Sequence, residues 1–217
     1  MSEDAPPGDS SSAGPDLRVR RRPVRERGRV RFDAILSVAR ELLLERGLEG
    51  FTIEDVAQRA GIPIGSVYQY FPNKFAVVVE LDAQDTGALV ADLVSSAERF
   101  PAVDWQHETN HLIDVIAGHW AAEPSRSAVW LAMRSNAATR SVAAEHTRAI
   151  VTTVLPIVSE LSPELPDASR RVIAEVVVEM CQSLLHFSVS DGPPNPATVH
   201  ELKRMLRAYL RAVALDA

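Results

Sequence analysis

Apolar residues recur at helical spacing along most of this chain. The first such segment puts its apolar side chains on one helix face, at Phe32, Ile35, Leu36, Val38, Ala39, Leu42 and Leu43. It should end near Gly47. Later helices are expected at 74–99, 104–122, 126–135, 139–161, 167–189 and 197–214. Prolines at or near several of these ends favour the boundaries, and Pro156 should kink its helix. The pattern predicts an all-α protein.

The sequence pattern from residue 51 to 71 differs from the rest of the chain. It predicts two short helices joined by a tight turn. Thr52 offers an N-cap oxygen, and Asp55 stands at the third helical position, as in a capping box. Val56, Ala57 and Ala60 supply a buried stripe. Gly61 should end this helix, because glycine accepts a positive φ at no steric cost.

A third helix is expected from about Ile64 to Phe71, with Val67 and Phe71 turned to the core. Its outer face would then carry four residues, namely Gly65, Ser66, Gln69 and Tyr70. A hydroxyl and an amide hydrogen-bond base edges or phosphates, and a glycine lets the backbone come close to DNA. The arrangement predicts a helix-turn-helix at about 51–70 with this helix as its reader.

Eight residues here agree in spacing and type with the pattern of one known family. They are Thr52, Ala57, Ala60, Gly61, Gly65, Tyr68, Phe71 and Lys74. The stretch 28–88 resembles the N-terminal domain of the TetR family of transcriptional regulators. The resemblance implies a three-helix DNA-binding domain joined to a larger helical domain for ligand binding and dimerisation. It also implies that Thr52, Tyr68 and Lys74 grip phosphates, while Gly65, Ser66, Gln69 and Tyr70 face the major groove.

Two positions depart from the family pattern. Pro63 stands where a serine or threonine is frequent, so the third helix should lack a side-chain cap, although proline suits a first helical turn. Ile64 stands where polar residues are frequent. It has no hydrogen-bonding group, so at most it would touch a thymine methyl group.

Charge is distributed very unevenly. Residues 17–31 hold eight arginines and one glutamate, a charge of +7 in a chain of net charge −6, so the rest carries −13. A basic arm on an acidic body favours contact of that end with a polyanion, although a solvated charge run is the plain alternative. We expect residues 1–27 to be a disordered tail ending in this arm. Arg27, Arg29 and Arg31 are the candidates for minor-groove contact.

Residues 89–217 are expected to form a helical effector-binding and dimerisation domain. The helix at 167–189 is apolar over most of its circumference, so it must be covered on two sides. Together with 197–214 it would form a four-helix bundle with a second copy, and the alternative is a central core helix of a monomer. The candidate pocket residues are Trp105, Trp120, Trp130, Met133, Met180 and Phe187. Each is also an ordinary core residue, and the sequence shows no converging polar group that would fix a ligand.

The run HETNH at 107–111 fits the H-E-x-x-H zinc signature, with His107 and His111 as ligands and Glu108 as general base. It suggests a second hypothesis, a metal sensor or a zinc hydrolase. Chance occurrence is the simpler interpretation, in which both histidines are solvated.

Composition fits a folded chain with a sizeable core, since 46% of the 217 residues are hydrophobic. No apolar run approaches a membrane span, the N-terminus lacks the form of a secretion signal, and Cys181 is the single cysteine. We therefore expect a cytoplasmic protein without a cofactor, and no enzyme motif is apparent besides HETNH. The sequence predicts a homodimeric repressor that binds a palindromic operator and is released by a small molecule.

Overall fold

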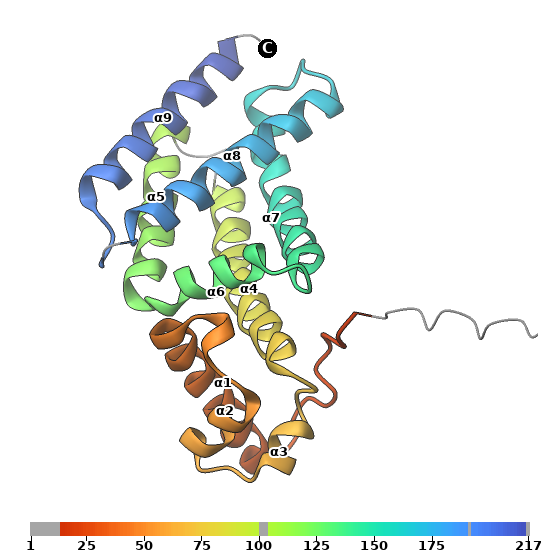
Figure 1. The fold of residues 1–217 in the computed structure, drawn as a ribbon. Helices are drawn as coiled ribbons and strands as arrows, with labels where there is room; N and C mark the ends of the chain where they lie inside the picture. Colours follow the sequence, from red (N-terminus) through yellow and green to blue (C-terminus); the bar gives the residue numbers. More distant parts are fainter. Residues whose placement is uncertain (1–13, 100–103, 191, 216–217) are drawn as a thin grey trace, which may run out of the picture.

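The computed structural model describes residues 14–99, 104–190 and 192–215. These residues form helices and no strand, which confirms the all-α prediction (Figure 1). The elements are α1 (Glu26–Arg46), the 3-10 turn η1 (Leu48–Gly50), α2 (Ile53–Ala60), α3 (Ile64–Tyr68), α4 (Lys74–Arg99), α5 (Trp105–Ala122), α6 (Ser125–Ser135), α7 (Arg140–Leu161), α8 (Asp167–Ser188) and α9 (Pro196–Leu215). None of the described helices has the length and apolar character that crossing a bilayer requires.

The first three helices pack around an aromatic cluster. Phe32 of α1 stacks on Phe71 with ring centroids 5.0 Å apart, and Val67 of α3 is fully buried beside them. The same core continues into α6, through residues such as Met133. The helices α1, α2 and α3 therefore share one apolar core with α6.

Local signals in the sequence account for the ends of the short helices. The Thr52 hydroxyl accepts a hydrogen bond from the Asp55 backbone N–H at 3.2 Å, and the Asp55 carboxylate accepts one from the Thr52 N–H at 2.8 Å. This confirms the capping box. Gly61 ends α2 in the left-handed region, with φ 64° and ψ 30°. Pro63 precedes α3 with no side-chain cap, as predicted.

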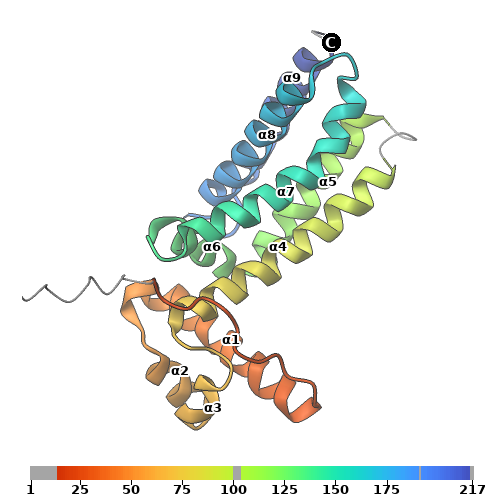
Figure 2. The ribbon, with the colours of Figure 1, turned by 90° about the vertical axis from the view of Figure 1, so that its right-hand side faces the viewer.

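α4 connects the two parts of the molecule. It starts beside α3, passes α1 and α6, and runs into the second domain between α5 and α7 (Figures 1 and 2). α8 and α9 lie side by side on the face of that domain remote from α4 (Figure 2). α4 therefore packs against helices of both parts of the molecule.

The N-terminal region differs from the prediction of a disordered tail to residue 27. α1 begins at Glu26, and residues 14–25 lie against the DNA-binding domain through hydrogen bonds described below. Residues 1–13 of the predicted tail lie outside the described residues. The arginine content is typical of disorder, but it also supplies the donors that hold this segment in place.

The turn at Gly61 leads to a first prediction. Gly61→Ala should destabilise the protein by about 1–2 kcal/mol, because an L side chain disfavours the left-handed conformation. No neighbouring atom lies within 4 Å of the added Cβ, so the cost is conformational. Gly87→Ala is the matched control. Gly87 lies inside α4 with equally open space, so alanine there should stabilise by roughly 0.5–1 kcal/mol. Urea unfolding measures both, and equal effects of the two changes would contradict the assignment of the turn.

Candidate nucleic-acid interface and inner cavity

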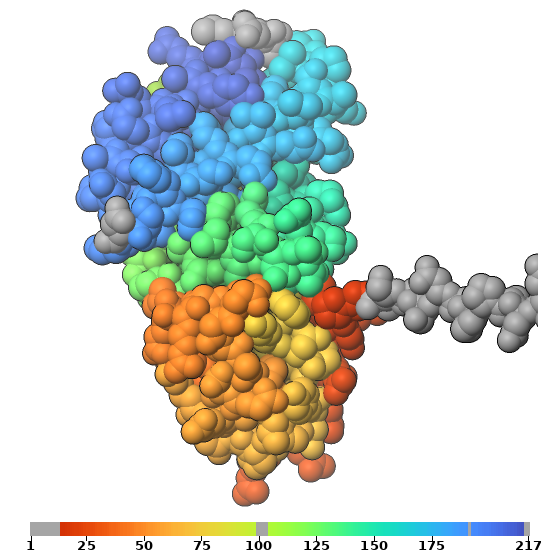
Figure 3. Space-filling view, viewed as in Figure 1, coloured from red at the N-terminus to blue at the C-terminus, as the bar shows by residue number. Residues whose placement is uncertain are grey.

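α3 presents its small and polar residues at one extreme end of the molecule (Figures 1 and 3). Gly65 and Gln69 are exposed, Ser66 is half-buried, and no atom lies within 4 Å of a Cβ built on Gly65. Ile64 is 39% exposed on the same short helix. An exposed helix face with a hydroxyl, an amide and a glycine can come close to the base edges in a DNA major groove.

Tyr70 does not lie on this face, so the predicted outward orientation is wrong. It is only 8% exposed and packs edge-on against Phe32, with ring centroids 5.5 Å apart. Residue 70 follows the buried Val67 by three positions, so helical spacing places both on the face that points to the core. Phe71 lies in the core, as expected.

Tyr68 and Thr52 are both engaged in local hydrogen bonds at the N-terminal end of α2. The Tyr68 hydroxyl donates to Glu54 Oε1 at 3.2 Å. Desolvation, and then the charge of Glu54, raises the pKa of Tyr68. Hydrogen bonds from the Glu54 backbone N–H and from the Thr52 side chain lower the pKa of Glu54. Tyr68 therefore stays a neutral donor, and its contact with phosphate, like that of Thr52, stays a prediction.

Lys74 lies at the first position of α4, as expected, but its ammonium group is turned toward the protein. It donates to the carbonyl oxygens of Leu48 at 2.8 Å and Phe51 at 3.3 Å, and to Glu49 at 3.3 Å. Lys74 thus ties α4 to the loop between α1 and α2. The predicted phosphate contact of Lys74 stays a prediction, and it would require these bonds to change.

Arg27, Arg29 and Arg31 lie within α1 rather than in an arm before it. All three are exposed, and Arg29 forms an ion pair with Glu26. Because a helix is too wide to enter a minor groove as an extended arm does, their expected mode of contact must be corrected. Their place at the N-terminal end of α1, on the side of the molecule where α3 lies, keeps them near any bound phosphates (Figure 2).

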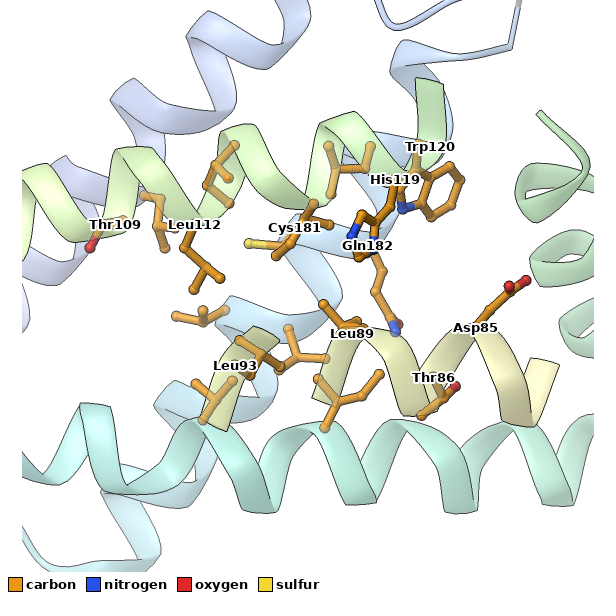
Figure 4. Close-up of a pocket in the computed structure, with 18 of the residues that line it drawn as sticks. Asp85, Thr86, Leu89, Leu93, Thr109, Leu112, His119, Trp120, Cys181 and Gln182 are labelled. Carbon is orange, nitrogen blue, oxygen red and sulfur yellow. The ribbon is translucent and has the colours of Figure 1, made fainter. Parts of the chain in front are cut away.

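The second domain contains a cavity of about 130 Å³, lined by residues of the six helices α4 to α9 (Figure 4). Trp120 and Trp130 line it, as predicted. Four other candidates do not belong to its lining, namely Trp105, Met133, Met180 and Phe187. Trp105 and Met180 pack against the second core, Met133 is buried in the first, and Phe187 is 63% exposed on α8. Helical periodicity alone does not distinguish these surroundings.

The structure brings together polar groups that the sequence alone did not reveal. Asp82, Asp85, His119, Arg126 and Gln182 all line the cavity. Figure 4 shows polar side chains from α4, α5 and α8 gathered toward one end, while leucines occupy the other. Desolvation raises the pKa of the lining Cys181 to about 12, which keeps its thiol neutral. The sequence does carry one signal, because aspartates at 82, 85 and 92 share one face of α4.

Asp85 joins three helices at the polar end of the cavity. Arg40 of α1 donates to both of its carboxylate oxygens, at 2.8 and 3.1 Å, and Arg126 of α6 lies 3.5 Å away. Arg40 also donates to the hydroxyl of Ser125 at 3.2 Å. The Asp85 side chain is only 14% exposed, so little solvent screens the ion pair. A helix of the DNA-binding domain thus reaches the cavity wall through one carboxylate.

Two histidine–aspartate pairs connect α4 to its other neighbours. His146 of α7 is hydrogen-bonded to Asp82, and this bond is the main cause of a raised pKa of His146. His119 of α5 lies 3.2 Å from Asp92. Both pairs are partly buried, and the raised pKa of His146 favours its charged form beside Asp82.

The HETNH motif does not form a metal site in the structure. His107 and His111 are exposed on α5, whereas Glu108 is buried and accepts a hydrogen bond from Ser96 at 2.7 Å. Over residues 14–99, 104–190 and 192–215, no group of three histidine, cysteine, aspartate or glutamate side chains could hold an ion. The metal-binding hypothesis is therefore unsupported.

Four large apolar side chains are exposed on α8 and α9, and they are here called the apolar stripe. They are Val172, Val176 and Phe187 of α8 and Met205 of α9. Three of these lie on one side of α8, at the spacing of a helix face. Large exposed apolar stripes of this kind are typical of surfaces that another protein covers.

The fold and the open face of α3 together define a helix-turn-helix regulator with an additional helical domain. Comparison with known proteins gives the family. A family model for bacterial regulatory proteins of the tetR family matches residues 35–81, and one for the tetracyclin repressor-like C-terminal domain matches residues 103–214, more than half of the chain. The chain belongs to the TetR family of transcriptional regulators. These are DNA-binding proteins and not enzymes.

Individual relatives share only part of their sequence with this chain. The HTH-type regulator YdeS of Bacillus subtilis is 36% identical over 85 residues, which are 33% of this chain and 43% of that protein. The match thus spans under half the length of this curated relative. A TetR-family structure from Streptomyces coelicolor is 25% identical, with a TM-score of 0.56 over 84% of this chain and 99% of that one. The multidrug-binding protein EbrR with malachite green shares the fold at 19% identity, with a TM-score of 0.62 over 82% and 97% of the two chains.

The His146–Asp82 pair generates a pH prediction. Since the pKa of His146 is raised above its ordinary value of 6.5 in the folded protein, the pair stabilises fully below that value. The contribution is lost as the pH rises through the raised pKa. The free energy of unfolding of the parent protein should therefore exceed that of His146→Gln most at low pH, and the difference should shrink from about pH 6.5 upward. A pH-independent difference between the two proteins would refute this assignment.

Proposed function

We propose that this chain is a homodimeric repressor that binds a palindromic operator in the cytoplasm and is released by a small molecule. The observation that carries the proposal is the single helix α4, which begins beside the open face of α3 and forms the wall of the cavity. Repression and release follow the family resemblance. The contacts of this chain support the DNA-binding face, the cavity and the connection between them.

Dimerisation is proposed because one α3 offers very few side chains to a groove. Gln69, Ser66 and Gly65 on one short helix give too small a readout to select a single genomic site. Two copies about one turn of DNA apart, or a multiple of it, double the readout. The exposed apolar stripe on α8 and α9 supports a two-fold contact there, because apolar area left in water opposes the monomer.

The proposed effector has an apolar body and one polar end. Leu89, Leu93 and Leu112 line one part of the cavity, while Asp85, His119 and Gln182 gather at the other (Figure 4). Apolar walls with a few polar groups are the usual composition of a small-molecule site. The malachite green held by EbrR, a protein of the same fold, is consistent with this assignment.

We further propose that Asp85 transmits occupancy of the cavity to the DNA-binding domain. A ligand group that pairs with Arg126 or Asp85 competes with the existing ion pairs, and Arg40 of α1 is then held less tightly. Such a change alters the angle between α1 and α4, and therefore the separation of the two α3 helices in a dimer. Coupling of this kind needs differential contacts in two states, which a shared carboxylate provides.

The dimer face gives a test of the proposed assembly. The double change Val176→Glu and Phe187→Glu should produce a monomer in analytical ultracentrifugation, because it buries charge in an apolar contact. Binding to a palindromic DNA fragment, found by footprinting the DNA beside the gene, should fall at least roughly a hundredfold, since the linked half-sites no longer act together. Val94→Glu changes an exposed valine on α4 and should leave both properties intact. A dimer that survives the double change would refute the proposed interface.

The Asp85 junction gives a test of the coupling that needs no known effector. Arg126→Gln and Arg40→Gln should each weaken binding to the same DNA fragment, although neither residue lies on α3. If Asp85 connects the two arginines, the double variant should bind the DNA fragment no more weakly than Arg40→Gln alone. The departure from additivity should be about 1 kcal/mol, or roughly fivefold in affinity. Glu179→Gln, which removes the partner of Arg134 on the α6–α8 surface, should add independently to Arg40→Gln. Strict additivity of Arg126→Gln and Arg40→Gln would contradict the coupling.

A further inference from the structure

Residues 14–25, here called the strap, lie extended against the DNA-binding domain. The backbone N–H of Arg20 donates to the Tyr70 carbonyl at 2.8 Å, and its guanidinium donates to the Tyr68 carbonyl at 3.1 Å. Tyr68 is the last residue of α3, and Tyr70 lies two residues beyond it. The strap is thus bonded directly to the recognition helix, where a cation also suits the carbonyl end of a helix.

A second anchor joins the strap to α4. Arg22 donates to both carboxylate oxygens of Glu80, at 2.8 and 2.9 Å. Glu80 is only 4% exposed, whereas the Arg22 side chain is 70% exposed. A buried carboxylate left without this partner would be costly, so the bidentate pair fixes which residue of the strap lies at this point.

The strap also packs closely against α1. A Cβ on Gly28 would approach the Cβ of Pro23 to 3.0 Å, so glycine at this position allows the contact. Val19 packs against the first core. Hydrogen bonds, an ion pair and packing therefore hold one short segment in a single register.

The remaining arginines of this region have no partner within the described part of the chain. Among those described residues, no hydrogen bond or ion pair is formed by the side chains of Arg18, Arg21, Arg25, Arg27 and Arg31, and all five are exposed. These arginines belong to the strap and the first turns of α1. Both segments extend to the end of the molecule where α3 lies (Figures 2 and 3). In a chain of net charge −6, these cations form a local basic surface beside the reading face.

We propose that the strap is a second DNA-contacting element, in which Arg18, Arg21 and Arg25 bind phosphates that flank the groove occupied by α3. Arg20 and Arg22 are positioning residues, because their own guanidinium groups are bound to the protein. The proposal rests on the proposed function and adds a contact outside α3 and α1. A strap already held in place loses less conformational entropy on binding than a free tail would, so its cations contribute more affinity.

The first experiment neutralises the contacting residues in the full-length protein. Arg18→Gln, Arg21→Gln and Arg25→Gln are combined, and affinity for the footprinted DNA and for an unrelated duplex is measured over a range of salt. The slope of log affinity against log salt should fall by about 0.9 for each phosphate that the protein no longer neutralises, or by roughly 2 to 3 in total. Both duplexes should be affected alike, because phosphate contacts carry no sequence information. An unchanged slope, with the footprint retained, would overturn the proposal, whereas a parent protein that binds no duplex would overturn the proposed function instead.

The second experiment distinguishes the effect of the position of the strap from the effect of the net charge of the protein. Glu80→Gln removes a negative charge and leaves every arginine in place, so charge alone predicts tighter DNA binding. If the Arg22–Glu80 pair sets the strap, affinity should instead fall several-fold and the salt slope should decrease. Glu45→Gln is the matched control, since it also removes one carboxylate that pairs with an arginine of the same domain, Arg59. That control should bind DNA as tightly as the parent or slightly more tightly. Tighter binding by Glu80→Gln would show that the strap needs no anchor and would refute its positioning role.

Discussion

The pairing of carboxylates on α4 with five separate elements is the constraint on which this architecture depends. Glu80 holds the strap through Arg22, Asp82 holds α7 through His146, and Asp92 lies against His119 of α5. Asp85 joins α1 and α6 at once. Each pair is at least partly buried on the α4 side. Because removing one partner of such a pair leaves a charge poorly solvated, α4 cannot shift without a compensating change in its neighbours.

This arrangement supports the proposed effect of the cavity on DNA binding. The first apolar core includes residues of α6 as well as α1, α2 and α3, so the DNA-binding domain and α6 move together as packed neighbours. The second core surrounds the cavity and ends at α8 and α9. α4 belongs to both, and its carboxylates lie where the two meet. In the proposed mechanism, a ligand that alters one ion pair at that boundary alters the relation between the domains.

Helix boundaries are readable from the sequence because prolines, glycines and a capping box mark them locally. The expected segment 74–99 corresponds to α4, and Thr52 and Gly61 bound α2 as predicted. The prediction for Tyr70 is wrong because residue 70 lies three positions after the buried Val67, and its ring packs against Phe32 in the core. The partners of Asp85 lie more than forty residues away in either direction, so periodicity cannot reveal them. The strap shows the same limit, since its arginines have the composition of a disordered tail and its anchors are distant.

Charge asymmetry gives the strap a further physical role. The chain outside residues 17–31 carries −13, so most of the molecule repels DNA at long range. Attraction is confined to the end that holds α3, the strap and the start of α1. A mobile basic tail would spread this attraction over a wide volume and favour encounters in the wrong orientation. Fixed to Tyr68, Tyr70 and Glu80, the same charges direct the approach so that α3 meets the groove first, and the repulsion of the acidic body then acts against every other orientation.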